Sequence, residues 1–278
     1  MSKQYKYTAL LTIAGSDSCG GAGIQADLKT FSALGCYGTS AITAITVQNT
    51  LGVSGIHSIP AEIVKGQIKV VMDDIKPMAI KIGMVHSAEL AVAIAAVLKE
   101  YPQIPVIFDP VMVSTSGHRL IEKDTIAALQ KELFPKAKLI TPNLSEAEIL
   151  AAMKINNVAD MKEAARRMIT AGCNAVLVKG GHLQGPDLFD VYLDKNGFEK
   201  TFRSTAISTK NTHGTGCTLS SAIAAFVGLN NDIYVAIEKA KAYVHEAIVA
   251  GQDVKTGEGH GPLNHLFDPQ KLFKHEME

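Results

Sequence analysis

The chain has 278 residues, and its 27 Lys and Arg residues balance 27 Asp and Glu residues, so the formal net charge is zero. Hydrophobic residues make up 47% and charged residues 19% of the chain. This composition excludes intrinsic disorder, and the sequence carries no basic run, which argues against nucleic acid as a partner. No apolar run reaches the roughly 18 residues of a membrane helix, so we expect no membrane partner.

The number and spacing of the cysteines indicate the redox environment of the protein. They show no C-x-x-C spacing, which argues against a zinc ribbon and a thioredoxin motif. The four are Cys19, Cys36, Cys173 and Cys217. Residues 9–14 form an apolar run, but it lacks the length and the cleavage site of a signal peptide. We therefore expect reduced thiols in a cytoplasmic protein.

Short apolar runs alternate with longer helical patterns along the chain. In chain order, the patterns predict a strand at 7–14, a helix at 23–34, a strand at 39–47, a helix at 60–76, a strand at 79–85, a helix at 87–101, and strands at 105–109, 139–141 and 175–179. Two runs at 188–194 and 198–204 flank Asn196-Gly197, a strong hairpin signal. A helix is expected at 218–229, and the tail from 251 is expected to be a loop followed by a short helix.

The strand patterns indicate the fold class. Each of the six earlier strands is a continuous apolar run, which is typical of a parallel sheet covered on both faces. Strands that alternate with helices favour βαβ units with right-handed crossovers. The composition stays even and contains no linker. We therefore predict an α/β protein: a single three-layer αβα domain over residues 1–278, with a mostly parallel sheet and an antiparallel hairpin.

Ligands of such sheets bind beyond the carboxyl ends of the strands. Polar residues and glycines gather at those ends: Gly15-Ser16-Asp17, Gln48-Asn49, Gly83-Met84, Asp109-Pro110, Thr141-Pro142-Asn143, Lys179-Gly180-Gly181 and the segment 211–217. The glycine-rich segment 15–23 is neither a Walker A loop nor a dinucleotide fingerprint. By itself it indicates a tight turn or a close approach of the backbone to a ligand.

The segment 211–217 leads into an apolar helix. A helix that begins at Gly214-Thr215-Gly216 would direct free N–H groups and the positive end of its dipole into the crevice, which makes an anion site. The alternative is an ordinary helix start capped by Thr215.

Asp109 and Glu146 follow separate strands and would face the same crevice. Oxygen ligands beside an anion site suit Mg²⁺ that is held mainly through water and phosphate. The alternatives are an Asp-Pro turn for Asp109 and, for Glu146, a place in the first helical turn beside a capping box formed by Ser145-x-x-Glu148. Lys179 ends an apolar strand, so it either meets an anion or extends to solvent.

Seven ordered blocks resemble the hydroxymethylpyrimidine/phosphomethylpyrimidine kinases of thiamine biosynthesis, which belong to the ribokinase-like superfamily. The blocks are Ala14-Gly15-Ser16-Asp17-Ser18 with residues 20–29, Val47-Gln48-Asn49-Thr50, Lys81-Ile82-Gly83-Met84, Asp109-Pro110-Val111-Met112, Thr141-Pro142-Asn143-x-x-Glu146, Lys179-Gly180-Gly181-His182, and residues 211–217 with 259–265. The resemblance covers nearly the whole chain. It implies a ribokinase-like fold, ATP and Mg²⁺ as cofactors, a small pyrimidine as substrate and a homodimer.

The resemblance also implies roles for single residues. Gln48 matches the residue that hydrogen-bonds the aminopyrimidine, and the further substrate-pocket positions are Gly15, Asp27 and Met84. Asn143 and Lys179 match contacts to the ATP phosphates, while Asp109 and Glu146 match the surroundings of Mg²⁺. Gly214, Thr215 and Gly216 match the backbone anion hole.

Cys217 stands where the sugar kinases of this superfamily carry a catalytic Asp. A helix N-terminus and a nearby cation lower the pKa of a thiol. The transition state of phosphoryl transfer is loose, so a weak base that chiefly orients the hydroxyl suffices. If the chain also phosphorylates the monophosphate, that nucleophile is already an anion and needs no base.

Other functions remain open at this stage. A pyridoxal or pyridoxine kinase of the same superfamily binds a similar ring with a hydroxymethyl arm, and an enzyme that uses both substrates is also compatible with the sequence. The Gln48 block and the block at 259–265 lean toward the pyrimidine. A non-catalytic nucleotide-binding module is disfavoured because every expected polar position is occupied. A dinucleotide dehydrogenase is disfavoured because its fingerprint is missing.

Overall fold

A computed structural model describes residues 3–112, 123–181 and 187–276. Its main sheet has nine strands in the order β10-β9-β8-β7-β6-β5-β2-β3-β4. Their bounds are β2 Ala9–Ser16, β3 Tyr37–Asn49, β4 Gly52–Ser58, β5 Ala79–Ile82, β6 Val106–Phe108, β7 Leu139–Ile140, β8 Ala175–Lys179, β9 Asp187–Asp194 and β10 Glu199–Thr205. The run from β3 through β8 is parallel, and the pairs β3/β4, β8/β9 and β9/β10 are antiparallel.

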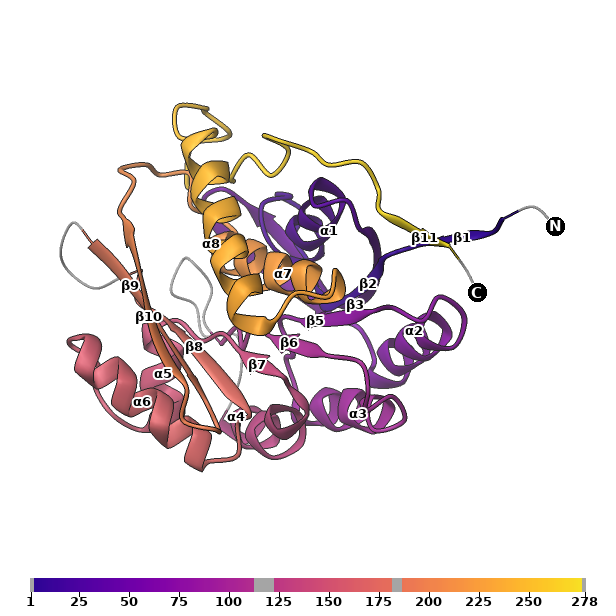
Figure 1. Ribbon diagram of the computed structural model, residues 1–278, viewed down its shortest axis with the longest axis horizontal. Coiled ribbons are helices and arrows are strands. Elements are labelled where there is room, and N and C mark those ends of the chain that lie inside the picture. The colour runs from indigo at the N-terminus through magenta and orange to yellow at the C-terminus, as the bar shows by residue number, and fades with distance from the viewer. Residues whose placement is uncertain (1–2, 113–122, 182–186, 277–278) are drawn as a thin grey trace.

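Helices cover both faces of this sheet (Figure 1). One face carries α1 (Gly23–Ala33), α7 (Thr215–Gly228) and α8 (Ile233–Val249). The other carries α2 (Ala61–Asp74), α3 (Ala88–Leu98), α4 (Lys123–Ala128), α5 (Leu144–Ala151) and α6 (Val158–Thr170). Each layer has its own apolar core against the sheet. The predicted α/β class, with three layers and a mostly parallel sheet, is therefore confirmed.

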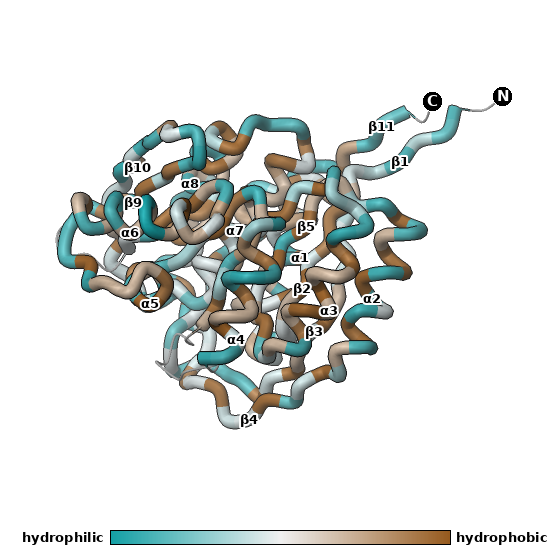
Figure 2. The backbone as a smooth tube through the Cα atoms, turned by 90° about the horizontal axis from the view of Figure 1, so that it is seen from below, coloured by the Kyte–Doolittle hydropathy of each residue, from teal (hydrophilic) through white to brown (hydrophobic). Residues whose placement is uncertain are grey.

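The structure corrects the sequence-based prediction at its edges. The C-terminal tail does not form the expected short helix: it ends in β11 (Lys274–Glu276), which pairs antiparallel with β1 (Tyr5–Tyr7). The tail stays extended because its backbone bonds to the turn before β3, through Phe273 N–H to the Gly35 carbonyl at 2.8 Å. Both views show this ribbon standing away from the main body (Figures 1 and 2).

The antiparallel pair of β3 with β4 was not predicted either. The edge strand β4 is mostly exposed, so it lacks the continuous apolar run that marks the inner strands. The β3/β4 register shifts between Val47 and Gln48. Such a bulge re-aims side chains, and here it lies at the end of β3 that faces the candidate site.

Four helices were also absent from the prediction: α4, α5, α6 and α8. Each packs on the sheet or on a neighbouring helix and adds to the two cores. Within the described residues, no helix has both the length and the apolar character needed to cross a membrane. His182, a member of one of the resemblance blocks, lies outside the described residues.

Candidate active site

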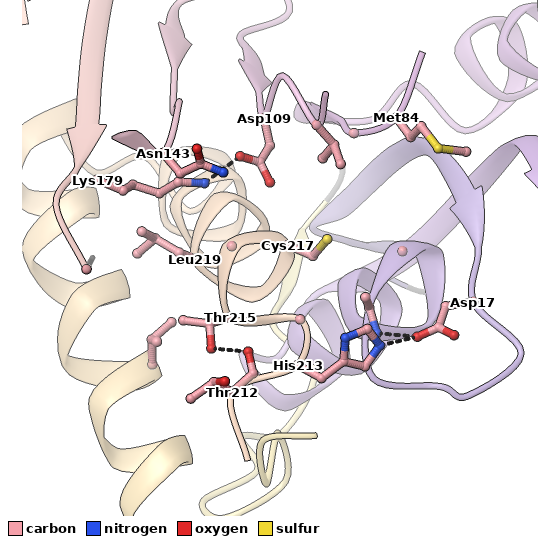
Figure 3. Close-up of a pocket in the computed structure, with 18 of the residues that line it drawn as sticks. Asp17, Met84, Asp109, Asn143, Lys179, Thr212, His213, Thr215, Cys217 and Leu219 are labelled. Carbon is pink, nitrogen blue, oxygen red and sulfur yellow. Dashed lines mark hydrogen bonds and ion pairs between the residues drawn. The ribbon is translucent and has the colours of Figure 1, made fainter. Parts of the chain in front are cut away.

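A cavity of about 790 Å³ lies at the carboxyl ends of the parallel strands and over the start of α7. Eleven of the twelve residues singled out from the sequence line it: Gly15, Gln48, Met84, Asp109, Asn143, Glu146, Lys179, Gly214, Thr215, Gly216 and Cys217. Figure 3 shows Lys179 and Asp109 on one side of the α7 start, Asp17 and His213 on the other, and Cys217 between them. Chain topology therefore gathers residues from seven separate segments in one place.

The start of α7 is built on glycine. Gly214 has φ +84°, and a Cβ at this position would lie 1.7 Å from the Gly21 carbonyl oxygen. The first helical bond runs from Thr218 N–H to the Gly214 carbonyl at 2.8 Å. The N–H groups of Gly216 and Cys217 have no acceptor among the described residues. This arrangement leaves donors available for an anion, as the motif predicts.

An ion pair lies over these free donors. Lys179 Nζ is 2.7 Å from Asp109 Oδ1, and Thr141 Oγ1 donates to the same oxygen at 3.0 Å. A Cβ on Gly216 would lie 3.2 Å from Lys179 Nζ, a tight contact that glycine avoids. Burial by itself would lower the pKa of Lys179, but the charges of Asp109 and Glu146 outweigh it and raise the pKa. Lys179 is therefore a cation directed at the anion site.

Glu146 belongs to the capping box of α5, and the predicted box has to be corrected. Asn143 Oδ1 accepts the Glu146 N–H at 3.0 Å, and Glu146 Oε2 accepts the Asn143 N–H at 2.8 Å. Ser145 and Glu148 do not form it, since Glu148 instead binds the backbone N–H of Ile155. A capping box ties the residue before the helix to the residue in its first turn, and here both residues face the cavity.

Asp109 fits a divalent cation directly, whereas both Glu146 oxygens already accept backbone N–H groups, from Met112 at 3.3 Å and from Asn143 at 2.8 Å, so Glu146 would act on the cation through water or through its charge. Asp109 Oδ2 has no hydrogen-bond partner among the described residues. Burial raises the pKa of Glu146 to about 7, the Asp109 charge adds to this, and Lys179 opposes it. A nearby divalent cation would favour the ionised form of both groups, and hard oxygen ligands of this kind are those that Mg²⁺ prefers.

Cys217 differs from the sequence-based expectation. Burial raises the pKa of its thiol to about 11, although the Lys81 charge and the Gly23 N–H act in the opposite direction. The argument that the helix N-terminus would lower this pKa is therefore wrong for the free site. At neutral pH Cys217 is a thiol, able to donate and to accept weak hydrogen bonds but not to act as a preformed base.

Asp27 is the one candidate that does not line the cavity. It is fully buried beneath the floor, where both carboxylate oxygens accept from Lys81 Nζ, at 2.9 and 2.8 Å. Thr12 and Ser221 also donate to it. Asp27 therefore has no path to a ligand in this structure, and it acts on the site through Lys81, which does line the cavity.

Two features were missed from the sequence. His213, weighed as a loop residue, lines the cavity with its Nε2 atom 2.8 Å from Asp17 Oδ2. Asp17, His213 and Cys19 bring potential metal ligands within 4.8 Å of one another. However, both Asp17 oxygens already accept backbone N–H groups, so the cluster does not fit a metal. An ion pair of Lys241 with Asp190 also lines the cavity.

The comparisons with known proteins agree with this geometry. Residues 17–264 match the family model described as phosphomethylpyrimidine kinase. The chain belongs to the phosphomethylpyrimidine kinase family. A hydroxymethylpyrimidine/phosphomethylpyrimidine kinase of Rhizobium meliloti is 48% identical over 92% of this chain and 96% of that protein. The thiamine biosynthesis bifunctional protein ThiED of Geobacter sulfurreducens is 49% identical, and the chain spans 52% of its length.

Solved structures extend the likeness to the fold. The phosphomethylpyrimidine kinase of Clostridium difficile is 47% identical with a TM-score of 0.77, over 86% of this chain and 99% of that one. The pyridoxal kinase of Staphylococcus aureus, solved with AMP-PCP and pyridoxal, is 32% identical with a TM-score of 0.85, over 98% and 99%. Membership of the phosphomethylpyrimidine kinase family confirms the resemblance and the ATP-dependent kinase activity that it implied. It also favours the thiamine-pathway function over the pyridoxal alternative.

Proposed function

We propose that the chain transfers the γ-phosphoryl group of ATP to 4-amino-5-hydroxymethyl-2-methylpyrimidine and then to the monophosphate, which gives the diphosphate. The observation that carries this proposal is the Lys179–Asp109 pair held over the free N–H groups of α7, in one cavity with Gln48 and Cys217. A cation, a carboxylate and backbone donors around one point are what phosphoryl transfer requires.

The ATP side of the cavity is assigned to β7, β8 and the start of α5. Lys179 and Asn143 would bind the phosphates, while Asp109 and Glu146 would hold Mg²⁺, partly through water. Bound Mg²⁺ would neutralise charge on the phosphates. The N–H groups of Gly216 and Cys217 are placed to stabilise the charge of the transferring group, which is the largest contribution expected in a reaction of this kind.

The acceptor side is assigned to β2, β3 and the residues after β5. Gln48 offers both a donor and an acceptor to the aminopyrimidine ring. Gly15 and Met84 would form its apolar wall, since a Cβ on Gly15 would lie 2.9 Å from Met84 Cε. Cys217 would orient the attacking hydroxyl with its thiol. Asp27 takes the role of a positioning residue that fixes the Lys81 ammonium below Cys217.

Pyridoxal is the second candidate substrate. The likeness to the Staphylococcus aureus pyridoxal kinase over almost the whole chain supports it. Both rings carry a hydroxymethyl arm of the same size, so a cavity for one admits the other. We propose the pyrimidine as the main acceptor and pyridoxal as a secondary one.

The test compares purified protein with Mg·ATP and each of three acceptors: hydroxymethylpyrimidine, its monophosphate and pyridoxal. ADP release on both pyrimidines, with little on pyridoxal, is the expected result. Turnover on pyridoxal alone would overturn the substrate assignment while keeping the phosphate site. A Gln48→Ala variant should weaken pyrimidine binding in calorimetry and leave ATP binding unchanged.

We also propose the domain organisation, the compartment and the oligomeric state of the enzyme. Residues 1–278 would form one domain, supported by the continuous nine-stranded sheet. Free thiols at all four cysteines suit the cytoplasm. Large apolar side chains are exposed on β3, β4 and the turn between them: Ile45, Val47, Leu51 and Ile56. This surface supports a homodimer. The Val47→Asp substitution should convert the dimer to a monomer, which sedimentation would measure.

A further inference from the structure

The Asp17 carboxylate fixes a hydrogen on the Nε2 atom of His213. Asp17 Oδ1 accepts the Cys19 N–H at 2.8 Å, and Oδ2 accepts the N–H groups of Gly21 at 3.1 Å and Ala22 at 2.8 Å. Burial would raise the pKa of Asp17, but the bonds to His213 and to the backbone hold it below its usual value. An ionised carboxylate only accepts hydrogen bonds. The His213 Nε2 atom, 2.8 Å away, therefore carries a hydrogen and donates it.

The His213 ring has no freedom to turn away. A Cβ on Gly21 would lie 2.4 Å from His213 Cδ2, and Pro262 packs beside the same position. The His213 backbone N–H donates to the Gly261 carbonyl at 3.0 Å. The N–H on Nε2 is therefore a fixed donor at the cavity edge, and the Gln48 amide nitrogen lies 3.4 Å from it.

With its nitrogen toward His213, the Gln48 amide cannot satisfy both of its neighbours. Its nitrogen faces the His213 N–H, which places two donors together. Its oxygen faces Thr46 Oγ1 at 3.2 Å, yet Thr46 has a single hydroxyl hydrogen, which also points to the Ser16 carbonyl at 3.0 Å. Amide oxygen and nitrogen are nearly the same size, so the hydrogen-bond network decides which is which.

Exchanging the two amide atoms resolves both conflicts. The Gln48 oxygen then accepts from His213, which shares its N–H between Gln48 and Asp17. The Gln48 nitrogen donates to Thr46 Oγ1, and Thr46 donates its own hydrogen to Ser16. One amide N–H and one lone pair of the oxygen then remain for a ligand, because a side-chain amide has two donors and two acceptor sites.

We propose that Thr46 and His213 are positioning residues that lock the Gln48 amide with its oxygen toward His213 and its nitrogen toward Thr46. The lock sets the order of donor and acceptor that the cavity presents to a ring. An aminopyrimidine, with an acceptor nitrogen beside a donor amino group, matches this order, whereas an oxo analogue does not. The inference rests on the proposed function only in naming this ring as the ligand.

Thr46→Val tests the lock, since it keeps the shape of the side chain and removes the acceptor for the Gln48 N–H. Thr39→Val is the matched control. Thr39 lies on the same strand and is equally buried, but its hydroxyl donates to the Leu10 carbonyl, at 2.8 Å, and it does not line the cavity. Thr46→Ser should restore the wild-type behaviour.

The kinetic readout is the preference for hydroxymethylpyrimidine over its 4-oxo analogue, measured as a ratio of kcat/KM. Thr46→Val should lower this ratio about tenfold or more through KM, with kcat for the amino substrate little changed, because a site built to pair a donor rejects a mismatched partner strongly. Thr39→Val and Thr46→Ser should keep the wild-type ratio. An unchanged ratio in Thr46→Val overturns the proposal.

A second readout does not depend on the substrate. In ¹⁵N-labelled protein without ligand, the Gln48 side-chain NH₂ signals can be assigned by their loss in Gln48→Ala. They should shift in Thr46→Val and in His213→Phe but not in Thr39→Val. Signals that stay in place in both test variants overturn the lock. If wild type does not phosphorylate the pyrimidine while the signals shift as expected, the proposed function fails and the lock stands.

Discussion

At the scale of single residues, the site places Cys217 between two buried ion pairs. Lys179 with Asp109 lies on one side, and Lys81 with Asp27 lies on the other. The lysine charges do not overcome the cost of burying a thiolate, so the thiol stays protonated at neutral pH with a pKa of about 11. Cys217 therefore acts on an acceptor by holding its hydroxyl rather than by removing its proton first.

Cys217→Ala should slow phosphorylation of the alcohol about tenfold or more, less than the loss of a full general base would cost. The monophosphate should be affected less, because its attacking oxygen is already an anion. Cys217→Ser should retain most of the alcohol rate, since a hydroxyl also orients a neighbour. Single-turnover assays on both acceptors measure this. Equal losses on the two acceptors would contradict an orienting role.

The sequence located those site residues that directly follow an apolar strand, such as Asp109, Lys179 and Gln48. Parallel strands bring their carboxyl ends together whatever the details of packing, so position along the chain was enough. Asp27 lies inside α1, and its direction depends on how that helix rotates against the sheet. His213 and Asp17 are far apart in sequence, and only the packing of two loops brings them together.

At the scale of elements, the start of α7 depends on one close backbone contact. Gly214 lies against Gly21, so the loop after β2 and the turn before α7 hold each other in place. This contact aims the free N–H groups of Gly216 and Cys217 into the cavity. A side chain at Gly214 has to separate the two loops.

Gly214→Ala should therefore remove almost all kinase activity, by about a hundredfold or more, because displaced backbone donors no longer stabilise the transferring group. The strained φ and the clash should also lower the free energy of unfolding by about 2 kcal/mol or more. Gly66→Ala is the control: it lies within α2, and a Cβ there meets nothing within 4 Å. It should keep full activity and stabilise by about 0.5–1 kcal/mol in urea unfolding. An active, stable Gly214→Ala protein would refute the contact.

The sequence predicted the strands that are buried on both faces, because such strands consist of a continuous apolar run. The edge strand β4 and the ribbon of β1 with β11 carry no such run. They form because neighbouring backbone groups need partners, and this requirement leaves little trace in side-chain type.

At the scale of the whole molecule, the C-terminal segment holds the catalytic face together. Asn211 donates to the Gly251 carbonyl at 2.6 Å, and Asn264 N–H donates to the Ala247 carbonyl at 3.1 Å. His265 is buried on α7, with Nε2 2.9 Å from Thr218 Oγ1. The segment after α8 therefore attaches α7, the helix of the anion site, to the body of the protein. The sequence did not predict this role of His265.

His265 makes this fastening sensitive to acid. Burial, and then the Lys29 charge, lower its pKa to about 4 in the fold, against about 6.5 in an unfolded chain. As the pH falls, the unfolded chain binds a proton on His265 before the folded chain does. The contribution of neutral His265 to the free energy of unfolding is therefore present in full above pH 6.5 and is lost as the pH falls toward 4. The loss between pH 7 and 4.5 amounts to roughly 2–3 kcal/mol.

Urea unfolding at pH 7 and pH 4.5 measures this difference in wild type and in His265→Gln. The variant starts less stable, because it loses the packing of the ring on Thr218. Its free energy of unfolding should fall less than that of wild type between pH 7 and pH 4.5, by roughly 2–3 kcal/mol. His57→Gln, at an exposed position on β4, is the control and should follow wild type. If wild type and His265→Gln lost the same stability between the two pH values, the buried neutral imidazole would not be what fastens the segment to α7.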